Sequence, residues 1–344
     1  MELSDRKLKI LQAIIDDYID AGVPVGSRTL SKKDGLTYSS ATIRNEMADL
    51  EELGYLEKPH TSAGRTPSDA AYRLYVDRLL RVDRLSREET AFISKYFDTR
   101  MNEIHEVLDN AAKALSDSTN HIALITEPNL QEVTIVRVQL VKITENKAML
   151  IFVTDNGIVR DTVINVSQEL TPDHMERLSN MLTEMVRNVS IASVSDVIHE
   201  MSSGVLQEQK GLMDQIMTAI DASRDKKNMI MEGAQKIFNY PEYKDIDKAR
   251  HFLQLLETKD MLFTMLSNTE DFECTIKIGS ENNNEDFREM SVVTATYKLG
   301  GKNIGSYGVI GPTRMDYSRV VSVLKYIGMS INDILASMVQ GEKK

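Results

Sequence analysis

The chain has 344 residues, a formal net charge of −11, 42% hydrophobic residues and 27% charged residues, a composition typical of globular proteins with two or three domains. The acidic balance excludes a histone-like protein that coats nucleic acid through bulk positive charge, but it leaves room for a local basic surface. Cys274 is the only cysteine, so no intrachain disulfide can form and a reducing cytoplasm is the expected location. The first residues, MELSDRKLKIL, lack an apolar signal core, and no apolar run reaches the length of a membrane span.

Three short helices are predicted near the N-terminus. The first follows Ser4 and ends before Gly22, the second begins near Ser27, and the third is ATIRNEMADLEEL, capped by Ser39 or Ser40. A tight turn separates the second helix from the third, which is the arrangement of a helix-turn-helix.

The third helix has two different faces. Its inner face carries apolar residues three and four apart, namely Ile43, Met47 and Leu50. Its other side carries small and polar residues, namely Ala41, Thr42, Arg44, Asn45 and Ala48. Arginine can pair with guanine edges in the DNA major groove, asparagine with adenine edges, and serine with phosphates. We therefore expect Thr42, Arg44 and Asn45 to read bases, and Ser39 and Ser40 to contact phosphates.

The stretch YLEKPHTSAGRTPS, which follows the third helix, predicts a short hairpin of strand, polar turn and strand. Such a hairpin beside a recognition helix is a wing. The residues expected along the DNA backbone are Lys58, His60, Thr61, Ser62 and Arg65, and Arg65 could reach into a minor groove. The same helices and hairpin could also form a protein-binding module, so an adaptor protein is the alternative function.

Strand and helix patterns then alternate along the chain. Strands are predicted at residues 121–127, then as a meander over VTIVRVQLVKI, KAMLIFVTD and IVRDTVINV, with Asn156-Gly157 as a hairpin turn. Residues 86–118 and 172–267 are predicted to be nearly all helical. Strands return at FECTIKIG, SVVTATYKL and IGSYGVIG, and an amphipathic helix begins near Asp316. Strands that stop and resume predict a multidomain α+β protein with an inserted domain.

Two segments resemble a known family. SSATIRNEMADLEELGYLEKPHTSAGRTPSDAAYRLYVDRL is similar to the DNA-binding region of the heat-inducible transcription repressor family, HrcA, and YGVIGPTRMDYSRVVSVLKYI is similar to the C-terminal signature of that family. The resemblance implies a winged helix-turn-helix domain at residues 1–85 and a GAF-like α/β domain at residues 86–129 and 270–344. It also implies an inserted, helix-rich dimerisation domain with a small antiparallel sheet at residues 130–269.

The same resemblance implies a function and partners. Members of this family act as homodimeric repressors that bind an inverted-repeat operator in double-stranded DNA upstream of chaperone operons, and the chaperonin supports their activity. A two-fold dimer suits such an operator because two recognition helices read two half-sites. We therefore expect a cytoplasmic repressor without a cofactor and without a membrane partner.

The sequence gives weaker support for a metal site, an enzyme active site or a phosphate-binding loop. The six histidines lack metal-ligand spacing, and no convergent nucleophile, base or metal set for an enzyme is visible. The glycines from Gly300 to Gly311 lack the lysine and the helix of a phosphate loop, so hairpin packing is the better interpretation. Arg314, in GPTRMDYSR, could hold an anion at a helix start or form a structural salt bridge; both readings stay open.

Overall fold

The structure is a computed structural model that describes residues 3–59, 64–98, 101, 103–128, 133–155, 159–202, 207–224, 228–267 and 274–340. The chain is α+β and divides into two compact units. The first unit contains residues 1–125, 229–297 and 306–331, and the second contains residues 126–228, 298–305 and 332–344. Predicted residues His60, Thr61 and Ser62 and the predicted Asn156-Gly157 turn lie outside the described residues.

The N-terminal module, defined here as residues 3–67, consists of three helices and a hairpin. Its elements are α1 (Asp5–Ala21), α2 (Ser27–Leu30), α3 (Ser40–Glu52), β1 (Leu56–Glu57) and β2 (Thr66–Pro67). Ile10, Leu30 and Ile43, one from each helix, are completely buried. The hairpin is antiparallel and pairs Leu56 with Pro67. The three predicted helices and the predicted hairpin are therefore present.

A helical connection leads from the hairpin into the rest of the first unit. Ser68 caps α4 (Asp69–Leu74) and its hydroxyl donates a 2.7 Å hydrogen bond to the carbonyl of Gly54. The π-helical turn η1 (Tyr75–Leu79) continues α4, and α5 (Arg87–Ser94) and α6 (Ile104–Thr119) follow. The stretch predicted as helical over residues 86–118 thus contains two helices. The first has a complete capping box between Ser86 and Glu89.

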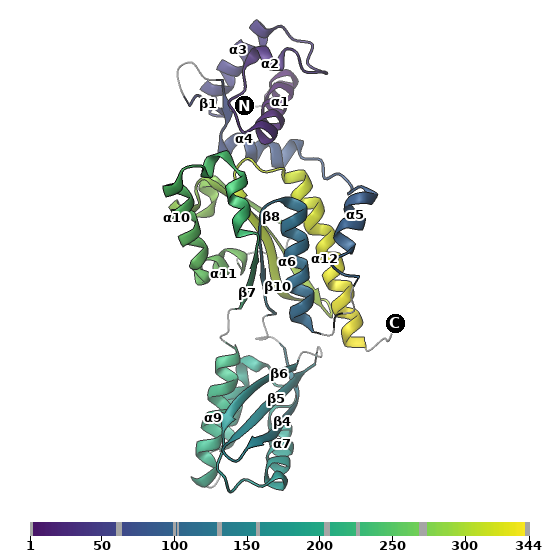
Figure 1. Cartoon of the computed structure of the whole chain (residues 1–344), viewed down its shortest axis with the longest axis vertical. Helices are drawn as coiled ribbons and strands as arrows, with labels where there is room; N and C mark the ends of the chain where they lie inside the picture. The colour runs from purple at the N-terminus through teal and green to yellow at the C-terminus, as the bar shows by residue number, and fades with distance from the viewer. Residues whose placement is uncertain are drawn as a thin grey trace. The chain divides into compact units, whose positions relative to one another are not determined.

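A five-stranded sheet forms the centre of the first unit, with strand order β7-β3-β10-β9-β8. Its strands are β3 (Ile122–Thr126), β7 (Met229–Glu232), β8 (Thr275–Ile278), β9 (Met290–Leu299) and β10 (Lys302–Pro312). Helix α6 and the C-terminal helix α12 (Tyr317–Gln340) lie on one side, and α10 (Ile246–Glu257) and α11 (Lys259–Ser267) lie on the other (Figure 1). Short 3-10 turns join these elements at Ala234–Asn239, Pro241–Tyr243, Gly279–Asn282 and Glu285–Phe287.

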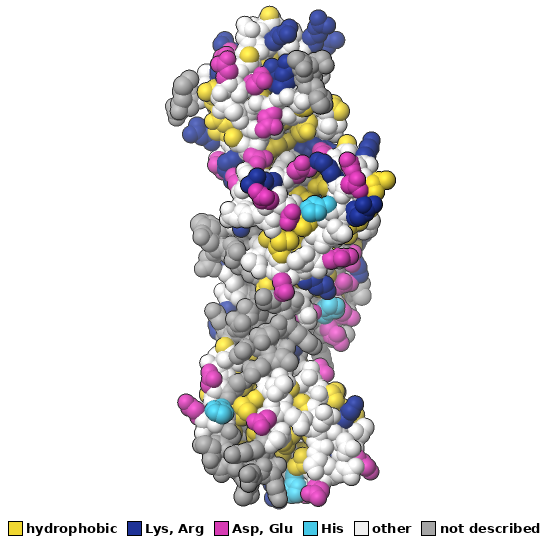
Figure 2. Space-filling view, turned by 90° about the vertical axis from the view of Figure 1, so that its left-hand side faces the viewer, with side chains coloured by type: hydrophobic (Ala, Val, Ile, Leu, Met, Phe, Trp, Pro, Cys, Tyr) yellow, Lys and Arg dark blue, Asp and Glu magenta, His cyan; other side chains and the backbone are white. Residues whose placement is uncertain are grey.

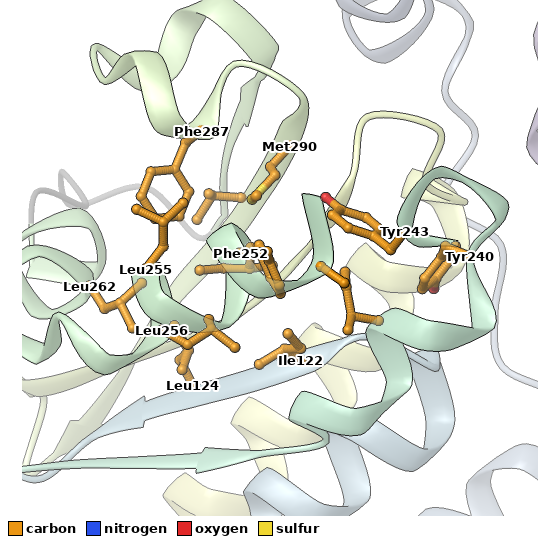
Figure 3. Packing of buried hydrophobic residues seen from close by; sticks show 14 of the residues in the cluster. Ile122, Leu124, Tyr240, Tyr243, Phe252, Leu255, Leu256, Leu262, Phe287 and Met290 are labelled. Atoms are coloured by element: carbon orange, nitrogen blue, oxygen red, sulfur yellow. The ribbon is translucent and has the colours of Figure 1, made fainter. Parts of the chain in front are cut away.

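The core under α10 and α11 joins chain segments that are far apart in sequence. Phe252, Leu256 and Leu262 of these helices pack on Ile122 and Leu124 of β3 (Figure 3). Residues 229–267 therefore pack with the five-stranded sheet, although the sequence analysis assigned them to an inserted domain at residues 130–269. Strand β7, which lies inside the stretch predicted as helical, is part of the same packing. Its sequence, MIME, carries no alternating pattern that would have predicted a strand.

The second unit contains a separate three-stranded antiparallel sheet in the order β4-β5-β6. Its strands are β4 (Ile135–Thr144), β5 (Lys147–Thr154) and β6 (Val159–Asn165), which confirms the predicted meander. The helices of this unit are α7 (Pro172–Val186), α8 (Val194–Ser202) and α9 (Gln207–Arg224), with a 3-10 turn at Ile191–Ser193. Along β5, Ala148, Leu150 and Phe152 are buried, which gives the sheet one covered face.

Helix α12 is a core helix. By length and composition it is the one helix among the described residues that could cross a membrane, but half of the relevant stretch is buried inside the protein. Its apolar stripe is buried throughout and consists of Tyr317, Val320, Leu324, Ile327, Ile331 and Leu335. Asp316 caps the helix by accepting a 3.0 Å hydrogen bond from the Arg319 amide. Packing against the sheet therefore explains the apolar character of α12.

Candidate nucleic-acid interface

The start of α3 is fixed by Ser39, one of the two residues predicted as its cap. Ser39 has extended backbone angles, and its hydroxyl accepts a 3.1 Å hydrogen bond from the Thr42 amide. The Ser39 and Thr42 hydroxyls lie 2.9 Å apart, and the Ser40 hydroxyl lies 3.2 Å from that of Ser27 in α2. Ser39 is exposed, whereas Ser40 and Thr42 are half-buried. The helix N-terminus, which favours anions, is therefore surrounded by hydroxyl groups.

The outward side of α3 carries the residues predicted there. Ala41, Arg44, Asn45 and Ala48 are exposed, while Ile43, Met47 and Leu50 form the buried side. Near its N-terminal end the exposed face is thus small and polar with Arg44 as its cation, and the exposed acidic residues Asp49 and Glu52 lie toward the other end of the helix.

Glu46 is a buried residue of α3 that the sequence analysis did not single out. Its side chain is 6% exposed, and its carboxylate is paired with Arg6 and, at 2.6 Å, with Lys7. The Lys7 ammonium also bonds Asp49 of the same helix at 2.7 Å. The hydrogen bonds to Asp49 and Glu46 raise the pKa of Lys7. Two cations of α1 therefore neutralise two carboxylates of α3, which limits their repulsion of an anionic ligand.

The hairpin is joined to the turn between α1 and α2. Val25 and Arg65 exchange two backbone hydrogen bonds, at 2.8 and 2.9 Å. Gly64 makes this approach possible, because a Cβ atom there would lie 2.4 Å from the Val25 carbonyl oxygen. Lys58, at the end of β1, is exposed.

Arg65 does not extend freely from the hairpin. Its Nε atom donates a 2.7 Å hydrogen bond to Glu51 Oε2, and its Nη2 atom lies 2.6 Å from the same oxygen. The arginine side chain is only 19% exposed. In this structure Arg65 ties the hairpin to α3, so a contact with DNA would require the pair with Glu51 to break.

Two further cations were missed by the sequence analysis. Arg28 and Lys32, at the helical turn around α2, are exposed, as are Arg44 and Lys58. Within the described part of the chain, these four side chains form no ion pair, whereas Arg6, Lys7, Lys33 and Arg65 are all paired. Lys and Arg side chains are visible among acidic ones on the N-terminal module at the top of Figure 2. The four-residue spacing of Arg28 and Lys32 was the available signal.

Comparisons with known proteins identify the family. Residues 105–321 match the family model described as HrcA protein C terminal domain. A heat-inducible transcription repressor HrcA of Ruminiclostridium cellulolyticum is 42% identical, over 98% of this chain and 99% of that protein. The chain belongs to the HrcA family. A second relative with the same description, from Halalkalibacterium halodurans, is 37% identical over 98% of this chain and 99% of its own length.

A solved structure shares the fold of this chain. A crystal structure described only as that of a hypothetical protein superposes with a TM-score of 0.69 at 25% identity, covering 98% of this chain and 100% of that one. Because curated members of the family are described as heat-inducible transcription repressors, the chain is a transcriptional repressor associated with heat-shock regulation.

Arg314 lies in the part of the chain that matches the HrcA family model, and it adopts one of the two roles left open by the sequence. Its guanidinium forms a salt bridge with Glu242, and Nη1 donates a 2.9 Å hydrogen bond to the Ile19 carbonyl. The side chain is 9% exposed. Arg314 is therefore a structural ion-pair residue here. Among the described residues, no group of three or more His, Cys, Asp and Glu side chains could hold a metal ion.

Proposed function

We propose that this HrcA-family protein represses transcription in the cytoplasm by binding, as a homodimer, an inverted-repeat operator in double-stranded DNA. We assign the N-terminal module to a winged helix and α3 to its recognition helix. The observation that carries the proposal is the exposed face of α3, where Arg44 and Asn45 stand beside the hydroxyl-lined helix N-terminus. Residues of these types at the start of a recognition helix suit the major groove.

Each predicted residue has a role in this proposal. Thr42, Arg44 and Asn45 read base edges, and the Ser39 and Ser40 hydroxyls contact phosphates. On the hairpin, the phosphate contacts come from Lys58, His60, Thr61 and Ser62. Arg65 contributes by holding the hairpin against α3 through Glu51. Arg28 and Lys32 add phosphate contacts from α2. This assignment separates residues that select a sequence from those that supply general affinity.

The proposed homodimer rests on the three-stranded sheet of the second unit, which we assign to the inserted dimerisation domain. Val159 and Val163 of β6 and Val141 of β4 are 57%, 53% and 41% exposed. The register places Met149, Ile151 and Val153 of β5 between those strands, on the same face. An antiparallel sheet with one face in water normally carries polar residues there, whereas contiguous apolar faces mark interfaces.

A second copy of the chain is the occupant that fits this face. Its charged positions include Arg137 on β4, Lys147 on β5 and Asp161 on β6, all exposed. A two-fold axis parallel to the strands would bring β4 of each copy opposite β6 of the other, so that Arg137 can pair with Asp161 of the second copy. This cross-pairing supplies the complementarity that an isologous dimer requires, and Lys147 lies at the opposite end of β5 from Val153, the residue paired with Arg137.

We assign the five-stranded sheet and its helices to a GAF-like domain.

We assign the chaperonin as the partner that maintains the fraction of repressor able to bind DNA. The chaperonin assignment follows from the family resemblance. A partner that refolds or stabilises the DNA-competent form raises its population, and diversion of that partner to unfolded clients lowers it. Added chaperonin should then increase the fraction of protein that binds operator.

Nuclease footprinting on DNA upstream of the organism's chaperone operon tests the proposal. The expected result is two protected half-sites related by a two-fold axis, lost together in the Arg44→Ala variant. Protection without symmetry would contradict the dimer. The absence of protection with protein that is folded and supplied with chaperonin would favour the protein-binding adaptor.

A further inference from the structure

Arg73 connects α4, directly after the hairpin, with the edge of the five-stranded sheet. Its Nε atom donates to Glu281 Oε1 at 2.8 Å, and its Nη2 atom donates to Glu281 Oε2 and, at 2.7 Å, to the Ile276 carbonyl. Glu281 belongs to the 3-10 turn that follows β8. A two-pronged pair of this kind fixes the direction of both side chains, in addition to their separation.

Arg314 makes a second connection, at the C-terminal end of α1. Its guanidinium is paired with Glu242, lies 5.3 Å from the centre of the Tyr240 ring and donates to the Ile19 carbonyl in the last turn of α1. The C-terminal end of a helix carries partial negative charge, so a buried cation is favourable there. Arg314 thus joins α1 to the sheet-forming part of the same unit.

Two glycines leave space for these connections. A Cβ atom on Gly22 would lie 3.0 Å from the Arg314 Cζ atom, and one on Gly279 would lie 2.1 Å from Asp69 Oδ2. The Asp69 carboxylate, at the start of α4, accepts hydrogen bonds from the Ser280 amide and hydroxyl at 2.9 and 3.1 Å. Both glycines have positive φ, at +64° and +52°, a conformation that suits glycine.

These contacts have a common consequence for the N-terminal module. Helix α4 lies between that module and the sheet within the first unit (Figure 1), and it is held at the sheet by Asp69 and Arg73, while α1 is held by Arg314. We infer that Arg73 and Arg314 are positioning residues that fix the direction in which α3 is presented within the first unit, and thereby narrow the range of half-site spacings that the repressor accepts. This inference rests on the proposed binding of an inverted repeat.

The physical reason is effective concentration. When one half-site is occupied, the second recognition helix binds with high effective concentration only if its position matches the second half-site. A recognition helix held rigidly within its unit therefore reaches fewer spacings. Modules on a loosened connection would reach several spacings, with less affinity at the correct one.

The test measures operator affinity as a function of spacing, for wild type, Arg73→Gln and Arg314→Gln. Three duplexes are used: the native repeat, a repeat whose spacer is lengthened by half a helical turn, about five base pairs, and a single half-site. Arg250→Gln is the matched control, because Arg250 forms an exposed pair with Asp247 three residues away on α10 of the same unit. Thermal unfolding checks that each variant is folded.

Wild type and Arg250→Gln should lose at least about tenfold in affinity when the spacer changes, whereas both positioning variants should lose about threefold or less. Affinity for the single half-site should be the same in all four proteins, a result that a general loss of structure would not give. Unchanged spacing selectivity in both folded variants would overturn the inference while leaving the repressor intact. Tighter binding of the native repeat by the variants would also overturn it. If wild type itself does not prefer the repeat, the proposed function fails first, and the inference fails with it.

Discussion

Arg65 of the hairpin and Glu51 of α3 form a bonded pair, with the arginine Nε and Nη2 atoms 2.7 and 2.6 Å from one carboxylate oxygen. Arg65 could either support the hairpin or bind DNA, and these two roles predict different effects of substitutions in the pair. If it supports the hairpin, Arg65→Ala and Glu51→Ala should weaken operator binding by similar amounts, and the double variant should lose no more than either alone. If Arg65 instead binds DNA, Glu51→Ala should release it and strengthen binding. We expect the first result in a double-mutant cycle measured by operator affinity.

Arg44→Ala should weaken binding to the operator by about 1–3 kcal/mol and affect random DNA much less, because a base contact carries sequence preference. The measurement is a pair of titrations, one on each duplex. Equal losses on both duplexes would show that Arg44 contacts phosphate rather than a base.

Lys58→Ala should weaken operator and random DNA alike and reduce the slope of log affinity against log salt by about one, because one phosphate contact is lost. Lys302→Ala, which removes an exposed lysine from the start of β10, is the control and should leave the slope unchanged. A slope that stays the same in Lys58→Ala would remove Lys58 from the interface.

Val163→Glu should disrupt the dimer, because it places a charge on the open apolar face of the three-stranded sheet. Sedimentation should show a shift toward monomer at low micromolar concentration, together with weaker binding of the full repeat. Gln168→Glu adds the same charge at an exposed loop residue of the same unit and should remain dimeric. A Val163→Glu protein that remained dimeric would place the interface elsewhere.

The stability of the first unit should depend on pH through His121. Burial, with the nearby charge of Arg314 as a smaller cause, lowers the pKa of His121 to about 3; its Nδ1 atom lies 2.8 Å from the Tyr240 hydroxyl. In the unfolded chain the ring titrates near pH 6.5, so below that value the unfolded state binds a proton that the folded state excludes. Stability contributed by neutral His121 is present above about pH 6.5 and decreases toward pH 3, by roughly 1.4 kcal/mol per pH unit.

The measurement is unfolding of wild type and His121→Gln near pH 7.5 and near pH 5.5. Wild type should lose more stability between these values than the variant, whatever the stability of each at the higher pH. His174→Gln, at an exposed histidine of the second unit, should follow wild type. Parallel losses in wild type and His121→Gln would show that His121 is protonated in the folded state.

The sequence predicted elements better than it predicted their assembly. Periodicity located α3 and its two faces, and local sequence limited its cap to Ser39 or Ser40, because these depend on neighbours within one helix turn. It could not predict that Arg65 pairs with Glu51 or that Glu46 is buried beneath two cations of α1. Such pairs join residues of different elements, and single-sequence patterns carry no signal for them.

Domain borders were harder for the same reason. Residues 229–267 have helical patterns that suit an inserted domain as well as the first unit. Contacts with Ile122 and Leu124 of β3 place them against the five-stranded sheet, and these contacts form only in the folded chain. Arg314 shows the same limit: its sequence context suited an anion or a salt bridge, and Glu242, 72 residues away, decided between them.

The most direct test of the central claim is fluorescence anisotropy of wild type on a duplex carrying the inverted repeat and on a scrambled duplex, over a series of salt concentrations. The account predicts tight, repeat-specific binding with a steep dependence on salt. Equal, weak binding to both duplexes by folded protein, unchanged when chaperonin is added, would contradict it.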